Sequence, residues 1–183
     1  AKDGCSGQGF CGACTVLING KPRLSCSTKL SQIAGKEIYT IEGLEEKRKS
    51  IIANALVEKG AVQCGFCTPG IVVKTYHLLE NSSNPSSIEI QKALRNHICR
   101  CTGYVKIVEG VELAAQWLQK GNIPERKKFT QFIGQSLPKY KGLETALGQR
   151  SFTDDLFFPG MLHAALVFSQ HPRAHILEID VSE

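Results

Sequence analysis

Eight cysteines are the residues of this sequence best suited to chemistry, and several of them stand only one or two residues apart. They are Cys5, Cys11, Cys14, Cys26, Cys64, Cys67, Cys99 and Cys101. Such close spacing makes awkward structural disulfides, and disulfide-stapled secreted domains are usually shorter than this chain. Thiolates that ligate a metal in a reducing compartment explain the pattern better, so we expect a cytoplasmic metal-binding protein.

The second half of this set gives the strongest signal. Cys64-x2-Cys67 and Cys99-x-Cys101 are separated by 31 residues, and each pair is too short to complete a site alone. Four thiolates that converge on one site suit either zinc or an iron–sulfur cluster. Each pair also precedes a predicted helix, whose N-terminal N–H groups would stabilise an anionic cluster. A zinc-stabilised module remains the alternative.

The first half has the pattern Cys5-x5-Cys11-x2-Cys14-x11-Cys26. Plant-type ferredoxins use C-x4-C-x2-C followed by a distant fourth cysteine. The first spacing here is one residue longer, which a bulge could absorb or which could displace Cys5 from ligation. The glycines of this loop allow the backbone to approach a cluster and donate N–H groups to sulfur.

Short β-strands should position the first cysteines. Thr15–Ile18 is a β-prone run, and Asn19-Gly20 favours a tight hairpin turn. Pro22 places the return strand at a sheet edge or makes it a strand start. A second short strand is predicted over 38–41. Residues 1–44 are therefore read as one small domain.

Four amphipathic helices should position the later cysteines. The first is predicted over 45–59 from its apolar stripe, and the second begins at Thr68-Pro69, read as an N-cap and first turn. The third follows a capping box from Ser86 to Glu89, and the fourth follows Gly103. Residues 45–120 are expected to form a small helical bundle.

The remainder of the chain is predicted to contain a linker and the start of a further domain. Residues 121–150 form the predicted linker, whose first half is polar, basic and contains proline. Residues 161–168 and 175–181 are predicted strands of a further domain, within 151–183. The chain starts at Ala1 without Met and ends in a predicted strand, so we expect both ends to be cut.

Composition excludes other classes of protein. The 183 residues carry a net charge of +5 from scattered lysines and arginines, and no nucleic-acid motif accompanies them. No run of 18 apolar residues could span a membrane. His77 and His97 are predicted surface or half-buried residues, and Trp117 is a predicted core or docking residue.

Three motifs in order make a specific resemblance. CGACTV at 11–16, QCGFCTPG at 63–70 and CRCTGY at 99–104 resemble the iron–sulfur part of the molybdenum hydroxylases, the xanthine dehydrogenase and aldehyde oxidoreductase family. Segments within 152–172 resemble the opening of that family's large molybdenum-binding part. The resemblance covers nearly the whole chain.

The resemblance implies an α+β fold. It comprises a truncated β-grasp ferredoxin-like domain, then a four-helix [2Fe-2S]-binding bundle, then the first strands of a molybdopterin-binding domain. It also implies two [2Fe-2S] clusters. The cluster nearer molybdenum would be held by Cys64, Cys67, Cys99 and Cys101, with Gln63 and Cys101 beside the pterin. The outer cluster would be held by Cys5, Cys11, Cys14 and Cys26.

The implied function is electron transfer. Electrons from a molybdopterin-type cofactor in the adjoining domain would pass through two clusters to a flavin or an external acceptor. The residues between 121 and 135 are too few for a flavin domain, so FAD is expected only on a separate subunit, if at all. Partners would be the remainder of the molybdenum domain, such a flavin subunit and further copies in a homo-oligomer.

The same family places its catalytic glutamate far downstream, so no catalytic residue is expected here. A free-standing ferredoxin-like carrier is the alternative from another class, although the predicted domain after residue 151 argues against it.

Overall fold

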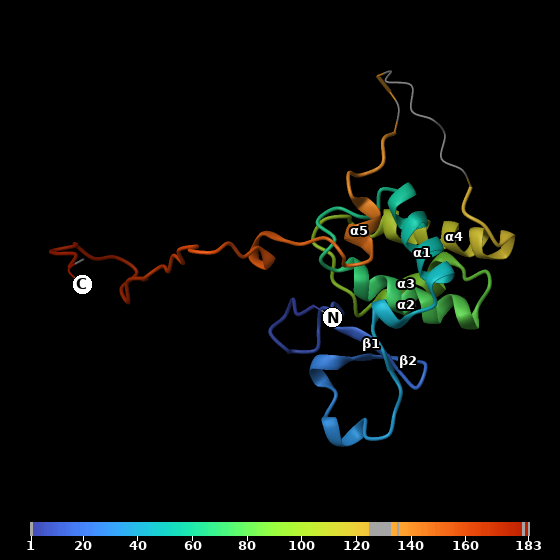
Figure 1. Ribbon diagram of the computed structural model, residues 1–183, viewed down its shortest axis with the longest axis horizontal. Coiled ribbons are helices and arrows are strands. Elements are labelled where there is room, and N and C mark those ends of the chain that lie inside the picture. Colours follow the sequence, from blue (N-terminus) through green and yellow to red (C-terminus); the bar gives the residue numbers. More distant parts are fainter. Residues whose placement is uncertain (1, 125–132, 135, 181, 183) are drawn as a thin grey trace. The chain divides into compact units, whose positions relative to one another are not determined.

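The computed structural model describes residues 2–124, 133–134, 136–180 and 182 (Figure 1). The chain divides into two units, 1–151 and 152–183, and each is described by itself. The first unit contains a small sheet and a group of helices, and it holds all eight cysteines.

The sheet has three antiparallel strands in the order β2-β1-β3. They are β1 (Thr15–Ile18), β2 (Lys21–Leu24) and β3 (Ile38–Tyr39). Asn19 and Gly20 both have positive φ, at 46° and 73°, as a tight turn requires. Pro22 lies in the edge strand β2, where its missing N–H leaves no ladder bond unmade. The hairpin and the edge position are as predicted.

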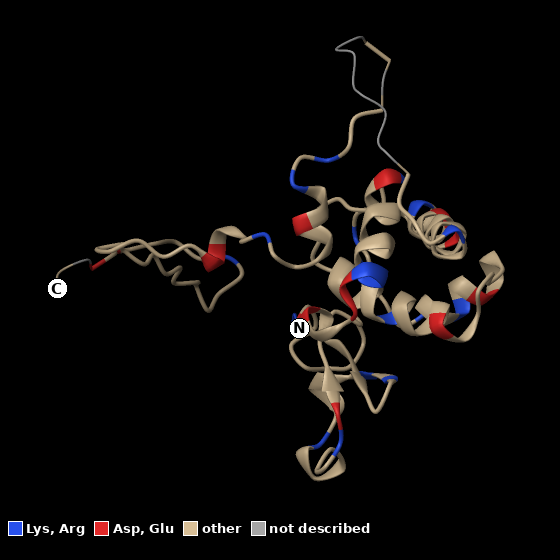
Figure 2. Cartoon of the chain, turned by 45° about the vertical axis from the view of Figure 1, so that its right-hand side comes forward, with Lys and Arg blue, Asp and Glu red and all other residues tan. Residues whose placement is uncertain are grey.

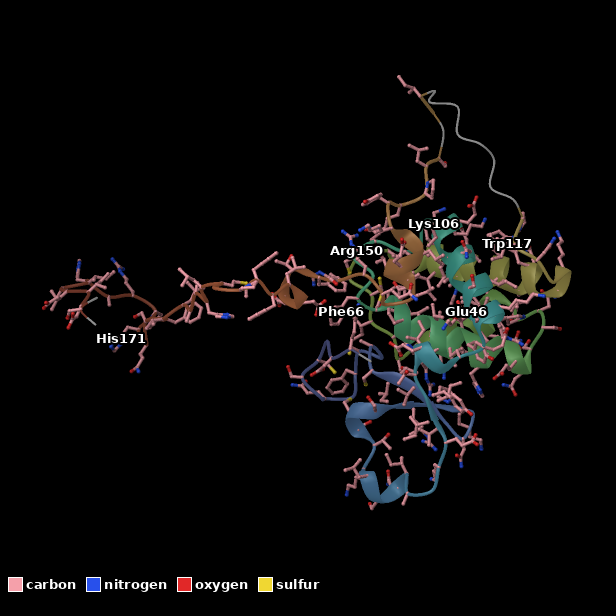
Figure 3. All side chains as sticks on the ribbon, viewed as in Figure 1. Glu46, Phe66, Lys106, Trp117, Arg150 and His171 are labelled. Carbon is pink, nitrogen blue, oxygen red and sulfur yellow. The ribbon has the colours of Figure 1, made fainter. Side chains whose placement is uncertain are left out.

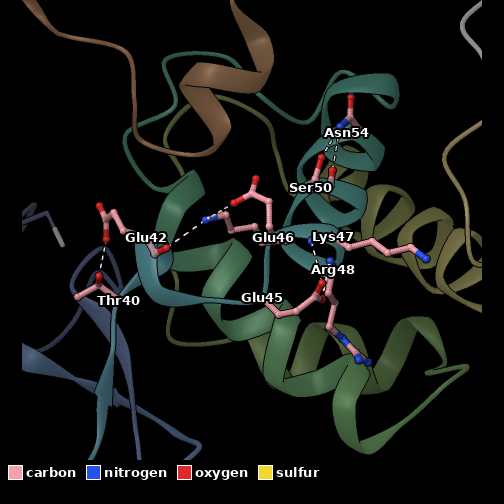
Figure 4. Close-up of polar contacts among 9 residues, drawn as sticks. Thr40, Glu42, Glu45, Glu46, Lys47, Arg48, Ser50 and Asn54 are labelled. Carbon is pink, nitrogen blue, oxygen red and sulfur yellow. Dashed lines mark hydrogen bonds and ion pairs between the residues drawn. The ribbon is translucent and has the colours of Figure 1, made fainter.

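The strand predicted over 38–41 is shorter than expected. It ends at Tyr39, and Ile41–Gly43 form a 3₁₀ turn. Ile41 is buried in the core, and the side chain of Thr40 donates to the carboxylate of Glu42 (Figure 4). The chain therefore turns toward the helices at this point.

Four helices begin and end close to the predicted positions. They are α1 (Glu46–Glu58), α2 (Thr68–Asn81), α3 (Ser87–Leu94) and α4 (Val105–Lys120). Glu45 caps α1 by accepting from the amides of Lys47 and Arg48 (Figure 4). The predicted capping box of Ser86 and Glu89 is present in α3. The N-cap of α2 is Cys67, and Thr68 is its first helical residue.

These helices enclose one core. Helix α1 packs against α4 and α2, and α3 packs against both α2 and α4. The largest fully buried side chains include Ile52, Leu56, Ile71, Ile90 and Ile107. Trp117 is buried, as expected of a core residue. Figure 2 shows that these helices carry both basic and acidic residues.

Lys49 is a buried cation that joins the 3₁₀ turn to α1. It is 5 % exposed, and its Nζ lies 2.9 Å from Oε2 of Glu46 and donates to the carbonyl of Glu42 at 3.1 Å. Both contacts satisfy the ammonium, which would otherwise be costly to bury.

The predicted linker contains a fifth helix. Helix α5 (Gly142–Ala146) packs against α1 and α2, and Thr145, Ala146 and Leu147 are buried. Apolar residues at i, i+3 and i+4 (Leu143, Ala146 and Leu147) give this short helix a packing face. The predicted linker at 121–150 therefore contains a short packed helix, whereas residues 125–132 and 135 lie outside the described residues.

The second unit contains a 3₁₀ turn at Thr153–Asp155. The strands predicted over 161–168 and 175–181 do not occur among the described residues of this unit, and residue 181 lies outside them. A strand needs a neighbour to receive its backbone hydrogen bonds, and no ladder forms here in the described residues. Large apolar side chains such as Leu162 and Leu177 are exposed. Across the described parts of the chain, no helix has the length and apolar character needed to cross a bilayer.

Candidate metal centres

The first cysteine centre is built on a curled loop before β1. The carboxylate of Asp3 accepts from the amides of Cys5 and Gly7, each at 3.2 Å. The pKa of the Cys5 thiol is lowered to about 7. The main cause is a hydrogen bond from the amide of Phe10, and hydrogen bonds from the amide and the thiol of Cys11 add to it. Cys5 and Cys11 therefore lie together, and the extra residue of the loop does not separate them.

The β-hairpin brings the other two cysteines of this centre together. Cys14 precedes β1, and Cys26 lies in the 3₁₀ turn that follows β2. Their Sγ atoms are 3.3 Å apart, and the amide of Ser25 donates to the carbonyl of Cys14 at 3.2 Å. The hydrogen bond with Cys14 raises the pKa of Cys26. We call Cys5, Cys11, Cys14 and Cys26 the outer group.

The second centre lies where two loops meet the N-termini of α2 and α4. Burial is the main cause that raises the pKa of the Cys67 thiol to about 12, and the charge of the nearby Cys99 adds to this effect. Cys64 lies against Cys101, and this contact raises the pKa of Cys101. Burial by itself raises the pKa of the Cys99 thiol. Hydrogen bonds from the Thr102 hydroxyl and from the backbone amides of Cys101 and Thr102 outweigh burial, so the pKa of this thiol is lowered. We call Cys64, Cys67, Cys99 and Cys101 the inner group.

In both groups the thiols are arranged as pairs. Cys5 pairs with Cys11 and Cys14 with Cys26, while Cys67 pairs with Cys99 and Cys64 with Cys101. Within the described residues, no three or more His, Cys, Asp or Glu side chains meet as a site for one metal ion. A [2Fe-2S] cluster takes four cysteine ligands, two on each iron. The paired thiols fit the cluster.

The two groups meet at a close backbone junction. A Cβ added to Gly70 in α2 would lie 2.5 Å from the carbonyl oxygen of Gly12. The amide of Ile98 donates to the carbonyl of Cys11 at 2.9 Å, so the residue before Cys99 is bonded directly to a residue of the outer group. The absence of side chains on Gly12 and Gly70 lets these segments touch.

His97 fills this junction. It is 4 % exposed, its Nε2 lies 3.2 Å from Oγ1 of Thr15, and a Cβ on Gly12 would lie 2.7 Å from its ring. Burial and then the charge of Lys74 lower its pKa to about 4. The expectation of a surface or half-buried histidine is wrong, because the contact with Gly12 is distant in sequence.

The residues predicted to face a pterin lie in the loops of the inner group. Gln63 is exposed beside Cys64, and Cys101, in the partner loop, is half-buried. The contact between Cys64 and Cys101 brings the two loops together. Their contact with a cofactor stays a prediction.

Sequence reasoning missed two residues that cover these loops. A Cβ on Gly65, which has a φ of +81°, would lie 2.0 Å from Cγ2 of Thr145, so α5 packs directly on the Cys64–Cys67 loop. The ring of Phe66 would lie 3.0 Å from a Cβ on Gly4, and Figure 3 shows this side chain near the N-terminal loop. The apolar spacing of Leu143, Ala146 and Leu147 was the one available signal for α5.

Two family models match the chain. One is described as a [2Fe-2S] binding domain and matches residues 40–112, and the other as a 2Fe-2S iron-sulfur cluster binding domain and matches residues 2–60. The nicotinate dehydrogenase small FeS subunit of Eubacterium barkeri is 43% identical over 116 residues, which cover 63% of this chain and 73% of that subunit.

Longer relatives extend the similarity. An aldehyde oxidoreductase of Megalodesulfovibrio gigas is 35% identical over all of this chain, which spans 21% of that protein. The crystal structure of an aldehyde oxidoreductase from Desulfovibrio desulfuricans superposes with a TM-score of 0.71 at 33% identity, over 82% of this chain and 18% of that one. The chain belongs to the molybdenum hydroxylase family and corresponds to the iron–sulfur region of its members.

Proposed function

We propose that the outer and inner groups hold two [2Fe-2S] clusters, which relay electrons between a molybdopterin-type cofactor and a flavin or external acceptor. The observation that carries this proposal is the arrangement of eight thiols as four pairs in two groups. When bound, each cluster supplies a redox centre that accepts one electron at a time.

The chain's own residues perform three tasks in this proposal. Backbone amides of the Cys5–Cys11 loop donate toward sulfur and stabilise its negative charge. The start of α2 at Cys67 directs a helix N-terminus at the inner group, which favours an anion. The hydrogen bond from Ile98 to Cys11 gives a short bonded connection between the groups.

The domain organisation, the pterin contacts and the partner subunits are part of the same proposal. We place a β-grasp ferredoxin-like domain at 1–44, a four-helix bundle at 45–120 and the beginning of a molybdopterin-binding domain at 151–183. Gln63 and Cys101 would contact the pterin. The match of the whole chain to an aldehyde oxidoreductase supports this order. Relatives that are small subunits support other subunits as partners. We further propose that FAD, if the assembly contains it at all, is carried by a separate subunit, and that the assembly is a cytoplasmic homo-oligomer.

Metal analysis and EPR spectroscopy test the proposal. The protein purified without oxygen should contain four irons and four sulfides per chain, as two [2Fe-2S] clusters require. After chemical reduction it should give two distinguishable EPR signals. Zinc bound without iron or sulfide would overturn the proposal and favour a zinc-stabilised module.

A further inference from the structure

The turn that leads from Cys99 into α4 is closed by hydrogen bonds of its own side chains. Oγ1 of Thr102 lies 3.2 Å from Sγ of Cys99, and the amide of Tyr104 donates to the same Oγ1 at 3.2 Å. The amide of Cys99 donates to the phenol oxygen of Tyr104 at 3.0 Å. Two side chains of the turn thus make contacts with the backbone and sulfur of one cysteine.

This turn is held in an unusual backbone conformation. Tyr104 has a φ of +71° and Gly103 a φ of +64°. A positive φ is disfavoured for tyrosine, because its Cβ crowds the backbone in this region. The conformation directs the Tyr104 ring back over the turn, where its oxygen meets the Cys99 amide.

The direction of the Thr102 hydrogen bond follows from the chemistry of ligation. A cysteine that ligates iron is a thiolate and has no proton to give. The hydroxyl must therefore be the donor in its contact with the Cys99 sulfur. The amide of Tyr104 occupies a lone pair of the same oxygen, which leaves the hydroxyl hydrogen for the sulfur.

We propose that Thr102 is a positioning residue of the inner cluster, whose hydroxyl donates to the Cys99 sulfur and raises the reduction potential of that cluster. The reduced cluster carries one more negative charge than the oxidised cluster, so a donor to its sulfur stabilises the reduced form more. Hydrogen bonds to sulfur are among the factors that set cluster potentials. This inference rests on the proposed function, because it requires a cluster on the inner group.

The test is a redox titration of the holoprotein followed by EPR, in which the outer cluster serves as an internal reference. Thr102→Val keeps the shape of the side chain and removes the hydroxyl. We expect the equilibrium constant for reduction of the inner cluster to fall about tenfold. A hydrogen bond to a charged group changes an equilibrium constant by about this factor, and here it acts mainly on the more negative, reduced form. A tenfold change corresponds to ~59 mV for one electron. Thr102→Ser should restore the wild-type potential.

Thr28→Val is the matched control. The hydroxyl of Thr28 donates to the backbone carbonyl of Leu24 at 2.7 Å, so its hydrogen bond goes to the backbone and not to a cysteine sulfur. This variant should leave both potentials unchanged. If Thr102→Val fails to load the inner cluster, Thr102→Ala, which is smaller, removes the same hydroxyl.

The outcomes separate the two proposals. A wild-type protein without a second cluster signal would overturn the proposed function. Two clusters whose potentials are the same in wild type and Thr102→Val would overturn only the role of Thr102. A lower potential that Thr102→Ser does not restore would assign the effect to packing and would also contradict the inference.

Discussion

Gly70→Ala should destabilise the protein although it improves the intrinsic helix propensity of α2. Alanine is favoured over glycine inside a helix by ~1 kcal/mol. The added Cβ, however, would lie 2.5 Å from the carbonyl oxygen of Gly12 and 3.3 Å from Cα of Ala13, where ordinary contact begins at 3.4 Å. Both obstacles are backbone atoms, so neither can rotate away.

The size of the effect follows from these two opposing contributions. Overpacking a tight contact costs ~1–3 kcal/mol, and a clash with backbone belongs at the upper end. After the gain in propensity, the net loss should be ~2 kcal/mol, which lowers the melting temperature by ~4–8 °C in a protein of this size. Urea unfolding and thermal melting of the loaded protein, followed by circular dichroism, measure it.

Gly110→Ala is the control, because it has the same change in helix propensity at another close contact. Its Cβ would lie 2.8 Å from Cδ2 of Leu56, the movable end of a side chain, although Cα of Leu56 is 3.1 Å away. The loss of stability should therefore be smaller than for Gly70→Ala. A Gly70→Ala protein at least as stable as the wild type would refute the argument that the junction requires glycine.

Four further variants probe the two groups and their surroundings. Cys101→Ser should abolish one reduced-cluster EPR signal and half of the iron, while Cys26→Ser should abolish the other signal. Loss of both signals in either variant would show that the groups are not independent. Leu147→Ala, at a buried position of the α5 segment, should lower the free energy of unfolding by ~2 kcal/mol in urea titrations; an unchanged midpoint would mean that α5 does not dock. His97 has a native pKa of about 4 against 6.5 unperturbed, so unfolding takes up a proton and stability should fall by roughly 3 kcal/mol as the pH is lowered from 6.5 to 4. In His97→Gln this acid-dependent loss should be smaller, and equal pH profiles would contradict the assignment.

Local signals in the sequence predicted much of the first unit. The Asn19-Gly20 turn, the capping box at Ser86 and the proline at the start of α2 depend on residues next to one another. Neighbouring residues therefore specify these local structures without help from tertiary packing. The pattern of cysteines likewise indicated two groups of four, and the structure brings thiols within each group together in pairs.

Features that depend on distant contacts could not be predicted. His97 is buried because Gly12, 85 residues earlier, provides the space for its ring. The division of each group into pairs depends on how two loops meet, and spacing alone does not specify it. Helix α5 has five residues, too few for a periodic pattern to stand out, and its burial comes from its contacts with α1 and α2.

The packing of Thr145 on Gly65 has a consequence for biosynthesis. The ribosome adds ~5–20 residues per second, so Thr145 is synthesised about 2–9 s after Cys101, the last cysteine. All four thiols of the inner group therefore leave the ribosome before the helix that covers the Gly65 turn exists. Iron and sulfide delivered during translation would therefore meet an open loop, which α5 would cover only later. The order of residues in the chain thus permits loading of the inner group before α5 closes over it.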